Sequence, residues 1–154
     1  MNTHEIVRRK QQLDHVFEQT TSVSQDAEIL SHWARYLCVL VSGFLESSIR
    51  VLYSQYARTK AAPNVANYVE AQLKYFQNAK MERILELARS FSPQWELELR
   101  TSSEGEPKDA VDSIVANKNN IAHGEGVGVT VSRMKRYYES ALAVVETIEA
   151  QCTR

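Results

Sequence analysis

Apolar residues recur every three or four positions along most of the chain, the spacing that places them on one face of an α-helix. The first run predicts a helix that Thr3 could cap, followed by a turn at residues 22–26. Its apolar face consists of Ile6, Leu13, Val16 and Phe17. From about residue 26 to residue 58 the pattern predicts a single helix roughly 50 Å long, with an expected kink near Ser42 and Gly43.

Proline and polar residues divide the middle of the chain. Pro63 ends the long helix, because the residue before a proline avoids the α conformation, and a shorter helix is expected to run to about Phe76. Asn78 is the predicted N-cap of the next helix, over residues 79–91.

The following segments also contain residues that typically begin a helix. Ser92 and Pro93 predict a short helix with serine as its N-cap and proline at its first position. Residues 101–106 are the most polar stretch and predict an exposed loop. Pro107 opens a further helix that is expected to end near Gly124.

The C-terminal segment predicts a turn and a last helix. Three glycines within residues 124–128 indicate the turn, and Thr130 or Ser132 is the expected cap of the helix after it. The apolar positions of that helix are Met134, Tyr138, Ala141, Val145, Ile148 and Cys152. Residues 1–154 therefore predict one all-α domain, a bundle of about six to seven helices with a long second helix.

Composition limits the classes of function. The chain has 18 Lys and Arg against 19 Asp and Glu, so it is not a polycation that coats nucleic acid, and any such site must be local. Two cysteines and four scattered histidines predict neither a disulfide framework nor a metal site, and no cofactor is expected. No apolar run approaches the roughly 20 residues that cross a bilayer, so we expect a cytoplasmic protein without a membrane partner.

One polar segment, residues 117–124 with the sequence NKNNIAHG, stands out near the end of a predicted helix. Asparagine has poor helix propensity, so packing alone would not select three of them here. Asn119 and His123 are four residues apart and share a face, whereas Lys118 lies about 140° away from His123 around the helix. The same residues also fit an ordinary helix C-terminus capped by Gly124, and the spacing alone leaves both interpretations open.

The pattern Lys118-Asn119-x-x-Ala122-His123-Gly124 resembles the RNxxAHG signature of the HEPN superfamily, a group of small helical bundles that includes many RNases. Residues 33–50, residues 78–95 and the helix from Val129 are also similar to its RiboL-PSP-HEPN branch, so that the resemblance covers nearly the whole chain.

The resemblance implies a homodimer in which two such motifs meet in one cleft and cut single-stranded RNA without a metal, often as a toxin with an antitoxin partner or in phage defence. In that family the histidine moves a proton at the ribose 2′-hydroxyl or at the leaving oxygen, and the arginine steadies the phosphate. His123 would then be the acid–base residue, Lys118 the phosphate-binding cation and Asn119 a residue that positions either group.

Lys118 departs from the signature, which has arginine at this position. Lysine keeps the charge but lacks the planar fork that binds phosphate through two bonds. The alternative function is therefore a catalytically silent HEPN module that binds RNA or serves as a dimerising partner.

Other residues are candidates for supporting roles. Glu46 on the long helix could orient Asn119 or His123, with Asn120 beside them, although an interhelical or solvated carboxylate is the alternative for Glu46. A basic and aromatic patch after the glycine turn could hold RNA phosphates and stack a base, or could simply be a solvated first turn of a helix. That patch consists of Arg133, Lys135, Arg136 and Tyr137.

Overall fold

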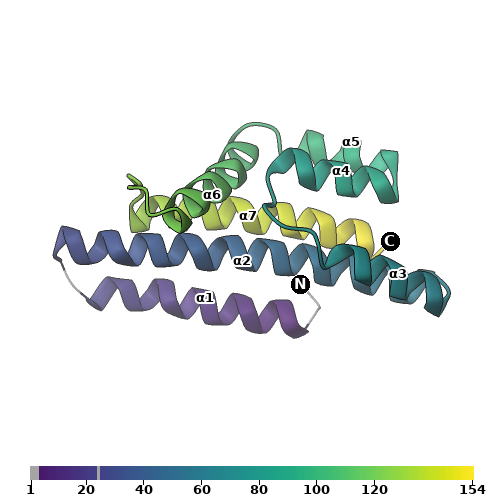
Figure 1. Ribbon diagram of the computed structural model, residues 1–154, viewed down its shortest axis with the longest axis horizontal. Helices are drawn as coiled ribbons and strands as arrows, with labels where there is room; N and C mark the ends of the chain where they lie inside the picture. The colour runs from purple at the N-terminus through teal and green to yellow at the C-terminus, as the bar shows by residue number, and fades with distance from the viewer. Residues whose placement is uncertain (1–3, 24) are drawn as a thin grey trace.

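The computed structural model describes residues 4–23 and 25–154, and every regular element in these ranges is an α-helix (Figure 1). The helices are α1 (His4–Val23), α2 (Ala27–Lys60), α3 (Pro63–Leu73), α4 (Met81–Phe91), α5 (Pro93–Ser102), α6 (Glu106–Ala122) and α7 (Val131–Cys152). The predicted all-α bundle with a long second helix is confirmed. The proposed cap Thr3 lies outside the described residues.

Helix α2 is the central element of the bundle. It packs against α1, α3, α6 and α7, while α4 and α5 form a helical hairpin that contacts α6 and α7 (Figure 1). Its inward face contains fully buried aliphatic and small side chains that join those of α6 and α7 in one core. These α2 residues include Leu37, Cys38, Val41, Leu45 and Ile49.

Helix α2 is continuous at the position of the expected kink. Helical hydrogen bonding continues through Ser42 and Gly43 over all 34 residues. Because Val41, Phe44 and Leu45 on either side of the glycine are buried in the core, packing holds this turn in place despite the poor propensity of glycine. Asp26 caps the start of the helix, since its carboxylate accepts the N–H groups of residues 28 and 29.

The prediction for Asn78 was wrong. Helix α4 begins at Met81, and Asn78 has the left-handed φ of 52° in the preceding turn. The Met81 N–H donates instead to the Asp112 carboxylate on α6, at 2.8 Å. A neighbouring helix thus supplies the cap that the local sequence was expected to provide. Helix α3 likewise ends at Leu73, before the expected Phe76, whose side chain is buried in the connection between α3 and α4.

The expected exposed loop at residues 101–106 is shorter than predicted. Helix α5 continues to Ser102, and only residues 103–105 form a turn before α6. Ser103 is buried, and its hydroxyl donates to the Leu99 carbonyl at 2.6 Å. A serine that satisfies its own hydroxyl within the helix can enter a packed turn. The other five residues of the stretch are exposed, as the polarity of the sequence predicts.

The statement that no apolar run is long enough for a membrane also needs correction. Among the described residues, α2 contains an 18-residue window that is long and apolar enough to span a bilayer by length and composition. Of this window, 56% is buried inside the bundle, as is usual for a central core helix. Serine, glycine and tyrosine residues divide this segment into short apolar runs without making the helix polar.

Candidate functional site

The end of α6 forms a complete Schellman motif. Gly124 has the left-handed φ of 74°, its N–H donates to the Ile121 carbonyl at 3.1 Å, and the Glu125 N–H donates to the Asn120 carbonyl at 2.8 Å. The prediction that Gly124 ends this helix is therefore confirmed, and the glycine is the residue directly after the cap. The two bonds fix the backbone on both sides of His123, which occupies the cap position itself.

His123 presents its imidazole to solvent at this fixed position. The residue is exposed, and within residues 4–23 and 25–154 its side chain makes no hydrogen bond or ion pair. Asn119, one turn earlier, is half-buried and accepts the His123 N–H through its backbone carbonyl at 3.1 Å. Asn120 is exposed on the adjacent side. The arrangement leaves both imidazole nitrogens available to a bound molecule.

Lys118 is held by a different part of the chain. Its ammonium group donates to the side-chain oxygen of Asn78, in the connection between α3 and α4, at 3.0 Å. Its charge also reaches α2: burial raises the pKa of the Cys38 thiol to about 11, and the nearby Lys118 acts in the opposite direction. The ammonium group is therefore directed toward the connection between α3 and α4.

Glu46 has a partner other than the expected ones. Its carboxylate accepts the backbone N–H of Asn78 at 2.8 Å and lies 3.8 Å from the Arg50 guanidinium one turn further along α2. Its hydrogen bond thus supports the connection that holds Lys118, and no hydrogen bond joins it to Asn119 or His123 in the described structure. Sequence reasoning missed Asn78 as a site residue. The available signal was the tolerance of asparagine for left-handed turns.

The predicted patch on α7 is divided among several surroundings. Lys135 lines a pocket on the α1 side, whereas the Arg136 guanidinium reaches Glu106 at the start of α6, at 3.3 Å. Tyr137 packs against the core, and Arg133 is exposed beside Thr130. Thr130 is the N-cap of α7, because its hydroxyl accepts the Arg133 N–H at 3.2 Å. Within the described residues, no hydrogen bond or ion pair joins these four residues to Lys118 or His123.

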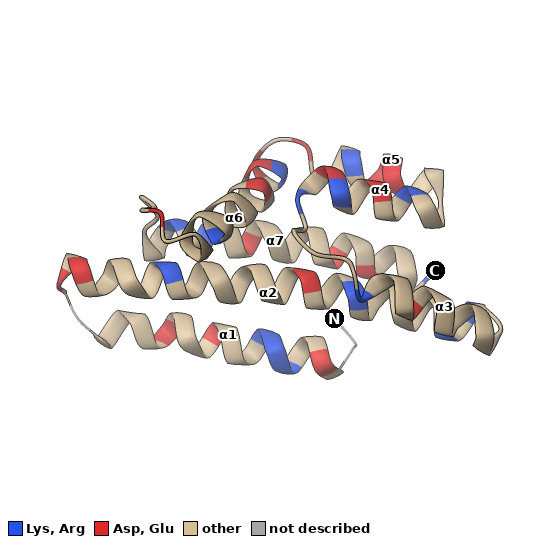
Figure 2. Ribbon diagram, in the orientation of Figure 1, with Lys and Arg blue, Asp and Glu red and all other residues tan. Residues whose placement is uncertain are grey.

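Charged residues are interspersed over the whole bundle. Figure 2 shows Lys and Arg next to Asp and Glu on the same helices, with no helix that is wholly basic. The described residues contain no group of three or more His, Cys, Asp or Glu side chains placed to hold a metal ion.

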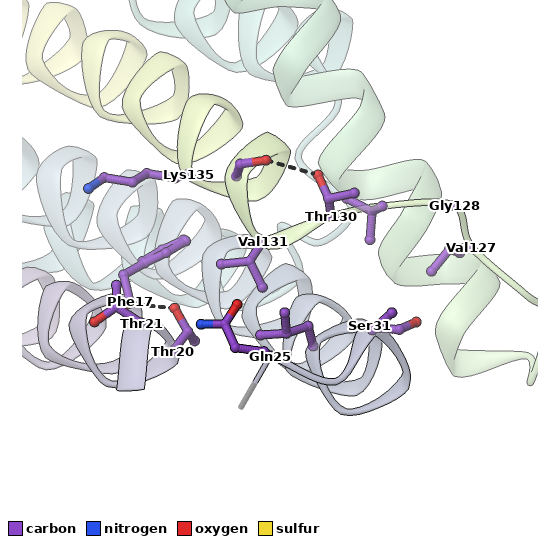
Figure 3. Close-up of a pocket in the computed structure, with 14 residues that line it drawn as sticks. Phe17, Thr20, Thr21, Gln25, Ser31, Val127, Gly128, Thr130, Val131 and Lys135 are labelled. Atoms are coloured by element: carbon purple, nitrogen blue, oxygen red, sulfur yellow. Dashed lines mark hydrogen bonds between the residues drawn. The ribbon is translucent and has the colours of Figure 1, made fainter. Parts of the chain in front are cut away.

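A pocket that the sequence did not reveal adjoins the segment after the motif. It has a volume of about 720 Å³ and lies between the end of α1, the start of α2 and residues 127–132 (Figure 3). Phe17 and Val131 contribute apolar walls, and Thr20, Thr130 and Lys135 add polar groups at its edge. Neither Lys118 nor His123 lines this pocket, so the candidate site at the end of α6 is separate from it.

A comparison with known protein families identifies the family of this chain. The model of the RiboL-PSP-HEPN family matches residues 4–154, which include all seven helices and the polar segment at the end of α6. Searches of curated proteins and of solved structures gave no match. Because the family match covers nearly every residue and the bundle has the expected long second helix, this chain belongs to the RiboL-PSP-HEPN family.

Proposed function

We propose that this protein is an endoribonuclease of the HEPN type, which cuts single-stranded RNA by transesterification without a metal ion. The observation that carries the proposal is the His123 imidazole, exposed and without a side-chain partner in the described structure, at a helix end whose backbone is fixed by the Gly124 cap. Membership of the family supports the same function.

The proposed reaction is an attack of the ribose 2′-oxygen on the adjacent phosphorus. The bond between that oxygen and phosphorus forms while the bond to the 5′-oxygen breaks, which leaves a 2′,3′-cyclic phosphate and a 5′-hydroxyl. A neutral His123 imidazole takes the proton of the 2′-hydroxyl, and a protonated one gives a proton to the leaving oxygen. In a homodimer the two copies of His123 divide these two steps between them.

Lys118 supplies the positive charge for the phosphate, on which negative charge accumulates in the transition state. A lysine ammonium group has three donors, and Asn78 accepts one of them. The two remaining donors can bind phosphate oxygens, although without the planar geometry of arginine. Asn119 would position His123 or the scissile group from the preceding turn.

The outer face of α2 supports assembly into a homodimer. Ile29, Tyr36 and Val39 lie on this face at helical spacing and are 43%, 51% and 44% exposed. Half-buried Trp33 and Leu40 extend the apolar surface between them. A second copy of the chain would cover it. We further propose a cytoplasmic location, because the long apolar helix α2 is the central helix of the bundle, and an antitoxin protein as partner on the basis of the family.

The second candidate function is a catalytically silent module that binds RNA or dimerises with an enzyme. Lys118 favours it, because lysine replaces the arginine of the family signature and already donates to Asn78. Loss of bidentate phosphate binding could reduce the chemical rate while RNA still binds through the charge.

The two functions are distinguished by RNA cleavage in excess EDTA with the purified chain, Lys118→Arg and His123→Ala. The matched control is His15→Ala, which removes an exposed histidine from α1. The nuclease proposal expects cleavage by the unchanged chain, an equal or higher rate for Lys118→Arg, and a loss of about 10²–10⁴-fold for His123→Ala alone. If no variant cuts although all are folded and dimeric, the silent module becomes the better description.

A further inference from the structure

Three segments that are distant in the sequence meet at Asn78. Its backbone N–H donates to Glu46 on α2 at 2.8 Å, and its side-chain oxygen accepts the Lys118 ammonium group of α6 at 3.0 Å. Asn78 thus links the long helix to the motif cation through one residue. It also has the left-handed φ of 52°, a conformation that a non-glycine residue adopts rarely.

The connection that carries Asn78 is anchored on both sides. On one side, Arg50 of α2 donates to the Phe76 carbonyl through Nε at 2.9 Å and also through a terminal nitrogen. On the other side, the Met81 N–H donates to the Asp112 carboxylate of α6 at 2.8 Å. The Phe76 side chain between these anchors is buried. The backbone that carries Asn78 is therefore held in place, and the exposed side-chain oxygen of this residue accepts from Lys118.

We propose that Asn78 is a positioning residue that holds the Lys118 ammonium group in place for the RNA phosphate; the catalytic meaning of this role rests on the function proposed above. A lysine side chain has four rotatable bonds, and ordering it in solution costs conformational entropy. An acceptor that orders the chain before RNA binds removes part of this cost from the reaction.

The neutral amide suits this role better than a carboxylate. An aspartate at position 78 would bind Lys118 as an ion pair, and its negative charge would offset the charge that attracts the phosphate. The asparagine oxygen leaves the full positive charge and two of the three donors of Lys118 available. Glu46, the nearest carboxylate of this cluster, is bonded to the backbone of Asn78 and lies beside Arg50.

Because Asn78 has a left-handed φ, a glycine variant can remove its side chain without straining the backbone. Glycine adopts this conformation without strain and keeps the backbone N–H that Glu46 accepts, so Asn78→Gly removes only the side-chain contact to Lys118. Gln77→Gly is the matched control, because it adds the same flexibility one residue earlier, at an exposed side chain without a hydrogen bond in the described structure. Asn78→Asp tests the effect of charge.

The kinetic test is a double-mutant cycle with Lys118→Met under steady-state conditions. We expect Asn78→Gly to lower kcat by about fivefold with a smaller effect on KM, because an ordered cation matters most when charge develops on the phosphate. Asn78→Gly should not change kcat in the Lys118→Met background. Gln77→Gly should not change kcat in the unchanged chain or in Lys118→Met. Asn78→Asp should raise KM, most strongly at low salt. Equal losses for Asn78→Gly in the two backgrounds would overturn the positioning role.

A second measurement does not depend on cleavage. In ¹H–¹⁵N NMR spectra of lysine ammonium groups, the Lys118 signal, assigned by its absence in Lys118→Met, should be visible in the unchanged chain and in Gln77→Gly. It should be lost in Asn78→Gly, where exchange with water is faster. An identical signal in Asn78→Gly would refute the contact itself. If the signal depends on Asn78 but no form of the protein cuts RNA, the contact stands and the nuclease proposal fails.

Discussion

Gly124→Ala tests whether the end of α6 needs a left-handed residue directly after His123. The residue has a φ of 74°, and a Cβ atom built there meets no other atom within 4 Å. The penalty therefore comes from the backbone alone, about 1–2 kcal/mol for an L-residue in this conformation. Alanine also restricts the unfolded chain, which returns about 0.4–1 kcal/mol. We expect a net loss of about 1 kcal/mol in the free energy of unfolding.

The measurement is urea unfolding followed by circular dichroism, with Gly126→Ala as the control. Gly126 lies in the same segment and has equally open surroundings, but its φ is outside the left-handed region. Alanine at position 126 should leave stability unchanged or raise it slightly. For a chain of this length, 1 kcal/mol corresponds to about 2–4 °C in Tm. Equal stability of the two variants would refute the argument that the Schellman motif requires glycine.

Three further predictions concern the core, the cysteines and assembly. Tyr138→Phe removes a hydroxyl that donates to the Asp14 carboxylate at 2.7 Å, and should lower the free energy of unfolding by about 1 kcal/mol in the same assay; an unchanged midpoint would contradict this. Burial raises the pKa of Cys38 to about 11 and that of Cys152 to about 12, so at pH 8 no more than about one thiol in a thousand is ionised. Cys38, which is buried, should react slowly with a disulfide reagent until urea is added, whereas Cys152 is only partly buried. Rapid labelling of Cys38 in the folded chain would contradict its burial. Val39→Asp places a charge on the outer face of α2 and should shift the mass in sedimentation from a dimer to 17.5 kDa, whereas an unchanged dimer would place the interface elsewhere.

Local chemistry explains which parts of the fold the sequence predicted well. Pro63 and Pro93 start helices, Gly124 ends one and Thr130 caps one, and each effect operates within a few residues of chain. The spacing of apolar residues identified the inward faces of α1 and α7 for the same reason. In α2 apolar residues lie on both faces, since Ile29, Tyr36 and Val39 are exposed, so spacing alone does not identify its inward face. The errors occur where another helix supplies the bond. Asp112, for example, caps α4 from 31 residues away.

The candidate site shows the same division between local and distant effects. The polar segment at the end of α6 was recognised from its own residues, but the partners of Lys118 and Glu46 were not, because Asn78 lies 40 and 32 residues from them. The patch on α7 was predicted as one surface. Spacings of three and four place Arg133, Arg136 and Tyr137 on one side of the helix, whereas Lys135 lies on another side and lines the pocket next to α1.

The central place of α2 has a consequence for synthesis of the chain. Helix α2 is translated early, whereas α6 and α7, which cover its inward face, come at least 45 residues later in the sequence. Until α7 has left the ribosome, α2, the long apolar helix of the nascent chain, lacks the helix that packs most extensively against it. Chaperones would meet the protein in this interval, and α6 would acquire its final support only when the last helix docks.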